Sequence, residues 1–271
     1  MAKPPKRPGS PGRSRPSRSP GPSSAPAGTR RAGSAVRRLG GGEAPGDPVS
    51  GRALKVRVET AKGRRLSSSR WLQRQLNDPY VAAAKKAGYR SRAAFKLIDL
   101  DDRFHLIRAG AGVVDLGAAP GGWTQVAVER AGADRVVGID LVAIDPVPGA
   151  ILQEHDFLDP ETPDILRSLI NGPVHAVLSD MAAPATGHRP TDHLRIVGLC
   201  EAAHAFAREV LEPGGSFCAK VLQGGAEGSL LSALREDFTT VRHAKPDASR
   251  SDSSEMYVVA LGFKKTSGAT G

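Results

Sequence analysis

The chain has 271 residues, of which 39% are hydrophobic, so it can bury one large core or two small ones. Its two cysteines, Cys200 and Cys218, form no Cys-x-x-Cys pair, and its histidines are not clustered at metal-binding spacing. We therefore expect neither a disulfide framework nor a metal site. No stretch reaches the ~20 apolar residues that span a bilayer, and the N-terminus lacks the apolar core of a secretory signal. These features predict a cytoplasmic protein with no membrane partner.

Charge is strongly polarised along the sequence. The first 95 residues hold 22 Lys and Arg against 4 Asp and Glu, which gives a net charge of +18. The remaining residues hold 16 basic and 24 acidic side chains, a net charge of −8. A basic N-terminal third favours a polyanionic partner, although a tail that only aids solubility would give the same count.

Composition divides the chain into two parts. Residues 1–62 are rich in Pro, Gly, Ser and Arg and show no hydrophobic periodicity, so we predict a disordered basic arm. A folded domain is predicted over residues 66–265. From Ser67 apolar residues recur at helical spacing among basic ones, which predicts short basic helices, and a further helix is predicted over Ser91–Leu100.

After Gly110, short apolar runs alternate with amphipathic stretches. This pattern is typical of a Rossmann-like, doubly wound α/β sheet that is mostly parallel and has helices on both faces. The predicted strands are Val113–Leu116, Arg135–Ile139, Ile151–Glu154, Val174–Ser179 and Ser216–Leu222. Helices are predicted near Thr124–Ala131, Pro163–Ile170, Asp192–Leu211 and Ser229–Glu236. Two last β-rich stretches, Thr239–Ala244 and Met256–Phe263, predict an antiparallel pair at one edge, which completes seven strands.

One glycine-rich segment carries the clearest functional signal. Val113-Val-Asp-Leu-Gly-Ala-Ala-Pro-Gly-Gly-Trp123 reads as a buried strand that ends in a turn and then enters a helix. Ligands bind at such carboxyl ends of strands. Gly117, Gly121 and Gly122 let the backbone approach a ligand, and the carboxylate of Asp140 would accept both ribose hydroxyls of a nucleoside.

A dinucleotide-binding dehydrogenase is the rival interpretation of this loop. The spacing is not Gly-x-Gly-x-x-Gly, however, and Pro120 removes a backbone N–H that a pyrophosphate would need. S-adenosylmethionine has a ribose, an adenine and a sulfonium but no phosphate, so it fits the loop better. Asp156, after the third predicted strand, would reach the adenine amino group. We therefore predict S-adenosylmethionine as cofactor, with a purely structural glycine turn as the alternative.

Four charged side chains are expected to meet at one cleft of the sheet: Lys96, Asp180, Lys220 and Glu255. Lys220 stands out because it interrupts an apolar strand, where an unpaired ammonium would be costly. Its carboxylate partner is predicted to be Asp180, which ends the neighbouring strand. Taken singly, each of the four could equally be a solvated surface group.

With these motifs in this order, the sequence closely resembles the FtsJ/RrmJ (RlmE) family of ribose 2′-O-methyltransferases. The resemblance runs from about Ser67 to Lys264 and rests on Ser-Ser-Arg-Trp-Leu, Asp-Leu-Gly-Ala-Ala-Pro-Gly-Gly-Trp, Ser-Asp-Met-Ala, Pro-Gly-Gly-Ser-Phe and Lys-Pro-Asp-x-Ser-Arg. It implies a class I methyltransferase domain that acts on a uridine of large-subunit ribosomal RNA. The sequence departs from the family in the loop after Asp180, which commonly contains Asn but here reads Ala182-Ala-Pro-Ala-Thr.

The resemblance also implies roles for individual residues. Lys96, Asp180, Lys220 and Glu255 would form a catalytic tetrad with Lys220 as the proton acceptor. Cofactor contacts are implied at Gly121, Trp123, Asp140, Asp156 and Asp180. In the reaction the ribose oxygen attacks the cofactor methyl, so alignment and removal of the hydroxyl proton decide the rate. The sequence leaves open whether Lys220 takes that proton or orients the hydroxyl while Asp180 takes it.

The basic segment before the sheet is expected to contact RNA phosphates through Arg70, Arg74, Lys85, Lys86, Arg90 and Arg92. We expect a monomer whose partner is large-subunit ribosomal RNA, on the assembled subunit. Transfer RNA is the nearest alternative substrate. A non-catalytic RNA-binding or ribosome-assembly module is the alternative from another class, and the complete tetrad argues against it.

Overall fold

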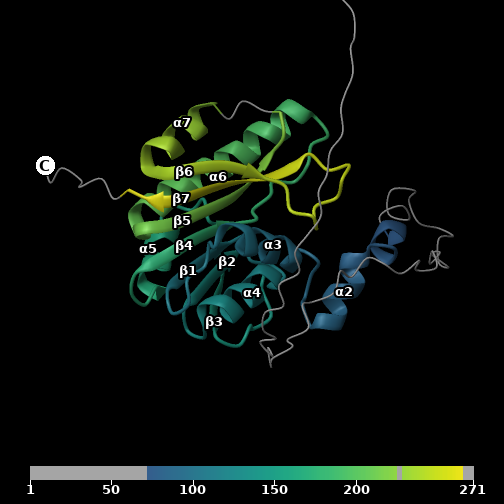
Figure 1. Cartoon of the computed structure of the whole chain (residues 1–271), viewed down its shortest axis with the longest axis horizontal. Coiled ribbons are helices and arrows are strands. Elements are labelled where there is room, and N and C mark those ends of the chain that lie inside the picture. Colours follow the sequence, from purple (N-terminus) through teal and green to yellow (C-terminus); the bar gives the residue numbers. More distant parts are fainter. Residues whose placement is uncertain (1–71, 225–227, 265–271) are drawn as a thin grey trace, which may run out of the picture. The chain divides into compact units, whose positions relative to one another are not determined.

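Seven strands form one sheet in the part of the chain that the structure describes. This computed structural model describes residues 72–224 and 228–264, so the predicted arm (residues 1–62) and Arg70 lie outside it. The strand order is β3-β2-β1-β4-β5-β7-β6 (Figure 1). In chain order the strands are β1 (Gly112–Leu116), β2 (Val136–Asp140), β3 (Ala150–Glu154), β4 (Val174–Ser179), β5 (Leu211–Leu222), β6 (Phe238–Ala244) and β7 (Glu255–Phe263).

The pairing of the strands confirms the predicted fold class. Strands β3, β2, β1, β4 and β5 are parallel neighbours, and β7 pairs antiparallel with both β5 and β6. The predicted start of the fifth strand was five residues late, because Leu211 already pairs with Val174. Regular pairing resumes only at Ser216, after a stretch in which Gly214 adopts a left-handed φ of 84°.

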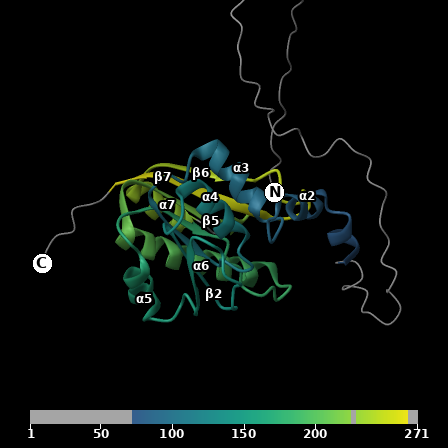
Figure 2. The same cartoon turned by 90° about the horizontal axis from the view of Figure 1, so that it is seen from below.

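Helices cover both faces of the sheet. They are α2 (Pro79–Ala87), α3 (Ala94–Phe104), α4 (Gly122–Ala131), α5 (Thr162–Leu169), α6 (Arg189–Val210) and α7 (Gly228–Asp237). Helices α3 and α4 pack on one face and α5, α6 and α7 on the other, as Figure 2 shows for α3 and α6. Consecutive residues of β1, Val113 and Val114, enter the two different cores. Burial on both faces explains why the central strands β1, β2 and β4 are mostly apolar.

The segment before β1 is helical, as the sequence predicted, but its bounds differ. Residues 72–76 are helical, and α2 then begins where Asp78 Oδ1 accepts a hydrogen bond from the Tyr80 amide at 3.1 Å. It ends at Ala87 and is capped by Gly88, whose φ is 83°. Helix α3 begins three residues later and ends four residues later than the sequence predicted. In the described ranges, no helix is both long and apolar enough to cross a membrane.

Candidate active site

The topology brings all four residues of the predicted tetrad to one edge of the sheet. Asp180 follows β4 and Lys220 lies near the end of β5, its parallel neighbour. Because β7 runs antiparallel to β5, its first residue, Glu255, starts at the same edge and pairs with Leu222. Lys96 comes from α3, which packs on the face above β1.

The four side chains form a chain of alternating charges. Lys96 Nζ lies 2.7 Å from Glu255 Oε1, and Lys220 Nζ lies 3.8 Å from Glu255 Oε2 and 2.7 Å from Asp180 Oδ1. Lys220 Nζ also donates to the Asp180 carbonyl at 2.8 Å. The side chains are only 11–18% exposed. Two ammonium groups therefore balance two carboxylates in a place that water reaches poorly, and Lys220 has the partner that its apolar strand requires.

Tyr257 occupies the centre of this cluster, and the sequence analysis missed it. Its hydroxyl donates to Asp180 Oδ1 at 2.6 Å and accepts from Lys96 Nζ at 3.4 Å, while its ring is fully buried against Trp123. Burial, followed by the charges of Asp180 and Glu255, raises the tyrosine pKa well above its usual value. The hydroxyl therefore stays protonated and holds Asp180 in place. The signal was present, since Tyr257 lies two residues after Glu255 on the same strand face.

We expect Tyr257→Phe to slow turnover without unfolding the protein. The phenyl ring keeps the packing, but Asp180 loses one donor, so we predict a kcat about 10-fold lower and an unfolding free energy lower by only about 1 kcal/mol. The KM for RNA should not change, because the hydroxyl is buried. Steady-state kinetics with thermal unfolding measures both. An unchanged kcat would reduce Tyr257 to a core residue.

A cavity of about 530 Å³ opens beside Asp180 and contains three of the predicted cofactor elements. Gly117, Asp140 and Asp156 line it, with Met181 and the following loop on another side. Its other lining residues are Ile139, Leu141, His155, Phe157, Leu158, Ala182, Ala183, Pro184, Arg195, Gly198 and Leu199. A mostly apolar pocket with a few carboxylates is suited to a nucleoside.

Gly117 has a geometric reason to be glycine. Its φ is 80°, and a Cβ there would approach the Met181 amide nitrogen to 2.8 Å. The glycine turn and the loop that follows Asp180 are thus packed backbone to backbone. Asp140 is held on the other side of the turn, where its carboxylate accepts from the Ala119 amide at 2.9 Å and the Val142 amide at 3.1 Å. These contacts fix the carboxylate at the rim of the cavity.

Three predicted cofactor positions do not line this cavity: Asp180, whose neighbour Met181 does, and Gly121 and Trp123. The Trp123 side chain is 2% exposed, and its indole N–H donates to the Ala93 carbonyl at 2.8 Å. Gly121 is the N-cap of α4, with a φ of 107°. Because the first N–H groups of a helix have no intrahelical partner, this terminus is suited to an anionic group. The predicted contacts at Gly121 and Trp123 can therefore be made only through the main chain.

Asp115, beneath the glycine turn, is a carboxyl group that the fold buries completely. Oδ2 accepts from Thr124 Oγ1 at 2.7 Å, whereas Oδ1 has no hydrogen-bond partner. Burial, reinforced by the nearby charges of Asp180 and Asp140, raises the pKa of Asp115 to about 7. The hydrogen bond from Thr124 acts in the opposite direction but is the smaller effect.

This shift predicts a pH-dependent stability that Asp115→Asn removes. A carboxyl that titrates near 3.8 when unfolded and near 7 when folded binds its proton more tightly in the fold. Stability is therefore lost as the pH rises from about 4 to 7. Because Asn mimics the neutral acid, the stability advantage of the variant should grow by about 2–3 kcal/mol between pH 5 and pH 8. Thermal or urea unfolding of both proteins measures the difference, and a constant difference would contradict the shift.

The predicted RNA-contacting residues fall into two groups. Arg74, Lys85 and Lys86 are exposed to solvent. The Arg90 guanidinium instead donates to the carbonyls of Pro120, Asp145 and Pro146, and Arg92 binds Asp78 and the Ala248 carbonyl. Arg90 and Arg92 thus hold loops together, and a phosphate contact would be a second role for either. In the described ranges, no His, Cys, Asp or Glu side chains group in threes to hold a metal ion.

Comparisons with known proteins define the class. Residues 89–263 match the FtsJ-like methyltransferase family model. The chain is 60% identical over 240 residues to a Paramagnetospirillum magneticum protein named ribosomal RNA large subunit methyltransferase E, covering 86% of this chain and 97% of that protein. A protein of the same name from Parvibaculum lavamentivorans is 57% identical over 238 residues, covering 84% and 94%.

A solved structure agrees with these matches. A crystal structure assigned to a ribosomal RNA methyltransferase of Plasmodium falciparum superposes with a TM-score of 0.58 at 27% identity, and it covers 65% of this chain and 98% of that one. The protein is therefore a methyltransferase. More particularly, the chain belongs to the FtsJ-like methyltransferase family, as its motifs predicted.

Proposed function

We propose that the protein transfers a methyl group from S-adenosylmethionine to the ribose 2′-hydroxyl of a uridine in large-subunit ribosomal RNA, on the assembled subunit. The observation that carries this proposal is the Lys96-Glu255-Lys220-Asp180 chain beside a nucleoside-sized cavity. The names of the relatives, which are ribosomal RNA large subunit methyltransferases, support the substrate class.

The cavity beside Asp180 fits the proposed cofactor. Asp140 would accept the ribose hydroxyls, and Asp156 would reach the adenine amino group from the same wall. The N-terminus of α4, at Gly121 and Trp123, would hold the amino-acid carboxylate. When bound, S-adenosylmethionine supplies a methyl group on a positively charged sulfur. The Asp180 carboxylate, between this cavity and Lys220, stabilises positive charge on that side.

The mechanism assigned to the protein consists of positioning and proton transfer. Lys220 Nζ is placed to hold the 2′-hydroxyl, and its neutral amine form, left after the ammonium releases a proton, would accept the hydroxyl proton and become an ammonium again; Asp180 Oδ1, 2.7 Å away, orients the Lys220 nitrogen. Lys96 occupies Glu255 at 2.7 Å and thereby keeps that carboxylate 3.8 Å from Lys220. Tyr257 fixes the same oxygen, Asp180 Oδ1, through its 2.6 Å hydrogen bond.

RNA would approach across the basic segment that precedes the sheet. The exposed side chains of Arg74, Lys85 and Lys86 would contact phosphates, with Arg70, Arg90 and Arg92 as further candidates. We extend the proposal to a monomeric enzyme that works in the cytoplasm, where ribosomes are assembled.

The test is transfer of labelled methyl from S-adenosylmethionine to unmodified large ribosomal subunits. Free large-subunit RNA and transfer RNA are run alongside, and the labelled nucleoside is identified after digestion. We expect label in 2′-O-methyluridine of the assembled subunit. Label in transfer RNA alone, or on a base instead of a ribose, would overturn the substrate or the reaction, and binding without transfer would favour a non-catalytic module.

A further inference from the structure

A second cavity, of about 410 Å³, borders the tetrad. Lys96 and Glu255 line it, and it shares no lining residue with the cofactor cavity beside Asp180. Its volume falls in the range of sites that take a small molecule or one unit of a polymer. A group bound there would therefore touch the catalytic cluster without displacing the cofactor.

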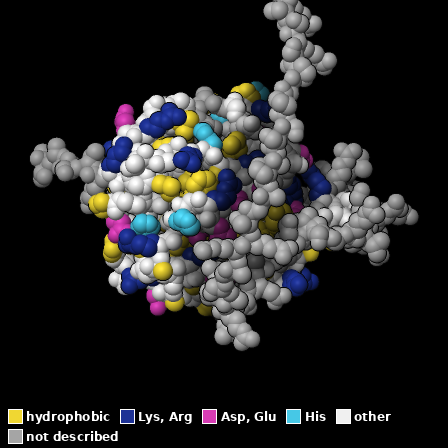
Figure 3. Space-filling model, in the orientation of Figure 1, with side chains coloured by type: hydrophobic (Ala, Val, Ile, Leu, Met, Phe, Trp, Pro, Cys, Tyr) yellow, Lys and Arg dark blue, Asp and Glu magenta, His cyan; other side chains and the backbone are white. Residues whose placement is uncertain are grey.

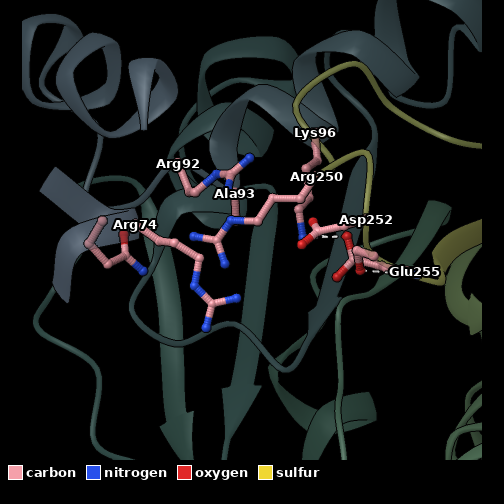
Figure 4. Close-up of a pocket in the computed structure, with 9 residues that line it drawn as sticks. Arg74, Arg92, Ala93, Lys96, Arg250, Asp252 and Glu255 are labelled. Carbon is pink, nitrogen blue, oxygen red and sulfur yellow. Dashed lines mark hydrogen bonds and ion pairs between the residues drawn. The ribbon is translucent and has the colours of Figure 1, made fainter. Parts of the chain in front are cut away.

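Arginines dominate one side of this cavity. Arg74 comes from helical residues 72–76, Arg92 from the turn before α3, and Arg250 from the loop between β6 and β7. Figure 4 shows the three side chains together, with the carboxylates of Asp252 and Glu255 on the other side. Three segments that are distant in sequence thus place guanidinium groups around one space.

The carboxylates nearby do not neutralise these arginines. Arg92 is paired with Asp78 and the Ala248 carbonyl, and Arg250 Nη2 lies 3.4 Å from the same Asp78 oxygen. One carboxylate therefore serves two guanidinium groups. Arg74 has no carboxylate within 4.0 Å among the residues that the structure describes.

Counting charges around the cavity leaves an excess of positive charge. Lys96 is matched by Glu255 at 2.7 Å. The three arginines then face only Asp78 and Asp252, so one positive charge remains. Arginine binds phosphate well because its planar guanidinium donates to two oxygens at once. The cavity is thus suited to one phosphate group.

We propose that Arg74 and Arg250 bind the RNA phosphate next to the ribose that is methylated. This inference rests on the proposed function and adds a substrate subsite to it. The carbon next to the one that bears the 2′-hydroxyl carries a phosphate through its 3′-oxygen, so a hydroxyl held at Lys220 brings that phosphate close to the neighbouring cavity. Arg250 lies in the loop that leads into β7, five residues before Glu255, the first residue of that strand, so phosphate binding would also steady a carboxylate of the tetrad.

The test compares Arg74→Gln and Arg250→Gln with Arg235→Gln, which removes the same charge from an exposed position on helix α7, outside the cavity. The KM for large-subunit RNA is measured at several salt concentrations, together with the dissociation constant of S-adenosylmethionine. We expect each cavity variant to raise the KM about 10-fold and to reduce the slope of log affinity against log salt by about 0.7–0.9. Cofactor affinity and the Arg235→Gln protein should match the parent.

Two outcomes separate this inference from the proposed function. If the parent methylates RNA but both cavity variants keep its KM and salt slope, the phosphate subsite is wrong and the proposed function stands. If the parent transfers no methyl to RNA, the proposed function itself fails. Because Arg250 also contacts Asp78, unfolding of Arg250→Gln is measured first. Should that variant be destabilised, Arg74→Gln, which loses no ion pair in the described ranges, decides the outcome.

Discussion

Replacing Lys220 by Met should reduce methyl transfer by about 10²- to 10⁴-fold, the range expected for loss of a general base. Met has nearly the same length, so the apolar strand around position 220 keeps its packing. The ammonium that lies 2.7 Å from Asp180 and donates to its carbonyl is lost. Single-turnover kinetics with saturating RNA and cofactor measures the chemical step directly.

Two further variants decide between the roles left open for Lys220 and Asp180. Arginine keeps a positive charge but does not release its proton in proteins. If Lys220 accepts the proton, Lys220→Arg should be nearly as inactive as Lys220→Met. If instead the ammonium orients the hydroxyl and Asp180 accepts the proton, Lys220→Arg should keep part of the activity, and Asp180→Asn should show the larger loss.

The matched control for these variants is Lys264→Met. Lys264 is also a lysine of the C-terminal half, but its Nζ donates to the Arg235 and Glu236 carbonyls, outside the tetrad. Its turnover should equal that of the parent. Full activity in Lys220→Met would remove Lys220 from the chemistry. Loss of cofactor binding in that variant would instead show that the cluster supports the cofactor cavity.

The fold was predictable because strands buried on both faces leave an unambiguous signal. The runs at Val113–Leu116 and Val174–Ser179 are apolar at seven of ten positions and buried at all but His175, and helices on both sides of the sheet account for this. The start of β5 was less predictable, since Leu211 pairs across an irregular stretch that contains Pro and Gly. Local propensity gives no sign of such an isolated pair.

The tetrad could be assembled from sequence only in part. Asp180 and Lys220 follow from strand ends, since carboxyl ends of parallel strands share one edge. Lys96 lies on a helix and Glu255 on an antiparallel strand, so strand ends alone do not place these two, and their roles came from the family resemblance. Their 2.7 Å ion pair depends on tertiary packing, as do the contacts of the Tyr257 hydroxyl with Lys96 and Asp180, although the strand spacing does put Tyr257 on the same face as Glu255.

Basic residues were the least predictable part of the site. Arg74, Arg90 and Arg92 lie in the same basic segment, so the sequence does not distinguish them. In the structure Arg90 donates to three carbonyls and Arg92 pairs with a carboxylate, whereas Arg74 is exposed. Arg250 ends the Lys-Pro-Asp-x-Ser-Arg motif but was not predicted to contact RNA, because it lies in the acidic part of the chain, 158 residues after Arg92. Only the fold brings Arg74, Arg92 and Arg250 to one cavity.

Asp140→Asn should weaken S-adenosylmethionine binding by about 10- to 100-fold, with little change in kcat at saturating cofactor. A hydrogen bond to a charged group contributes about 1.5–3 kcal/mol, which corresponds to this range of affinities. The carboxylate accepts from the Ala119 and Val142 amides. An Asn side chain has one acceptor oxygen, so its NH₂ group must face one of these two donors. Calorimetric titration with S-adenosylmethionine measures the affinity.

The matched control is Asp145→Asn, which removes an exposed carboxylate from the loop after β2. Asp145 does not line the cofactor cavity, and the Arg90 contact in that loop uses its carbonyl instead of its side chain. The affinity of Asp145→Asn for S-adenosylmethionine should equal that of the parent. This control separates the loss of a specific ribose contact from a general loss of negative charge. Unchanged affinity in Asp140→Asn would remove the ribose role. A lower kcat with full affinity would instead place Asp140 in the transfer step. We do not expect this result, because Asp140 ends β2, which is two strands away from β4 and Asp180, and so has no direct access to the tetrad.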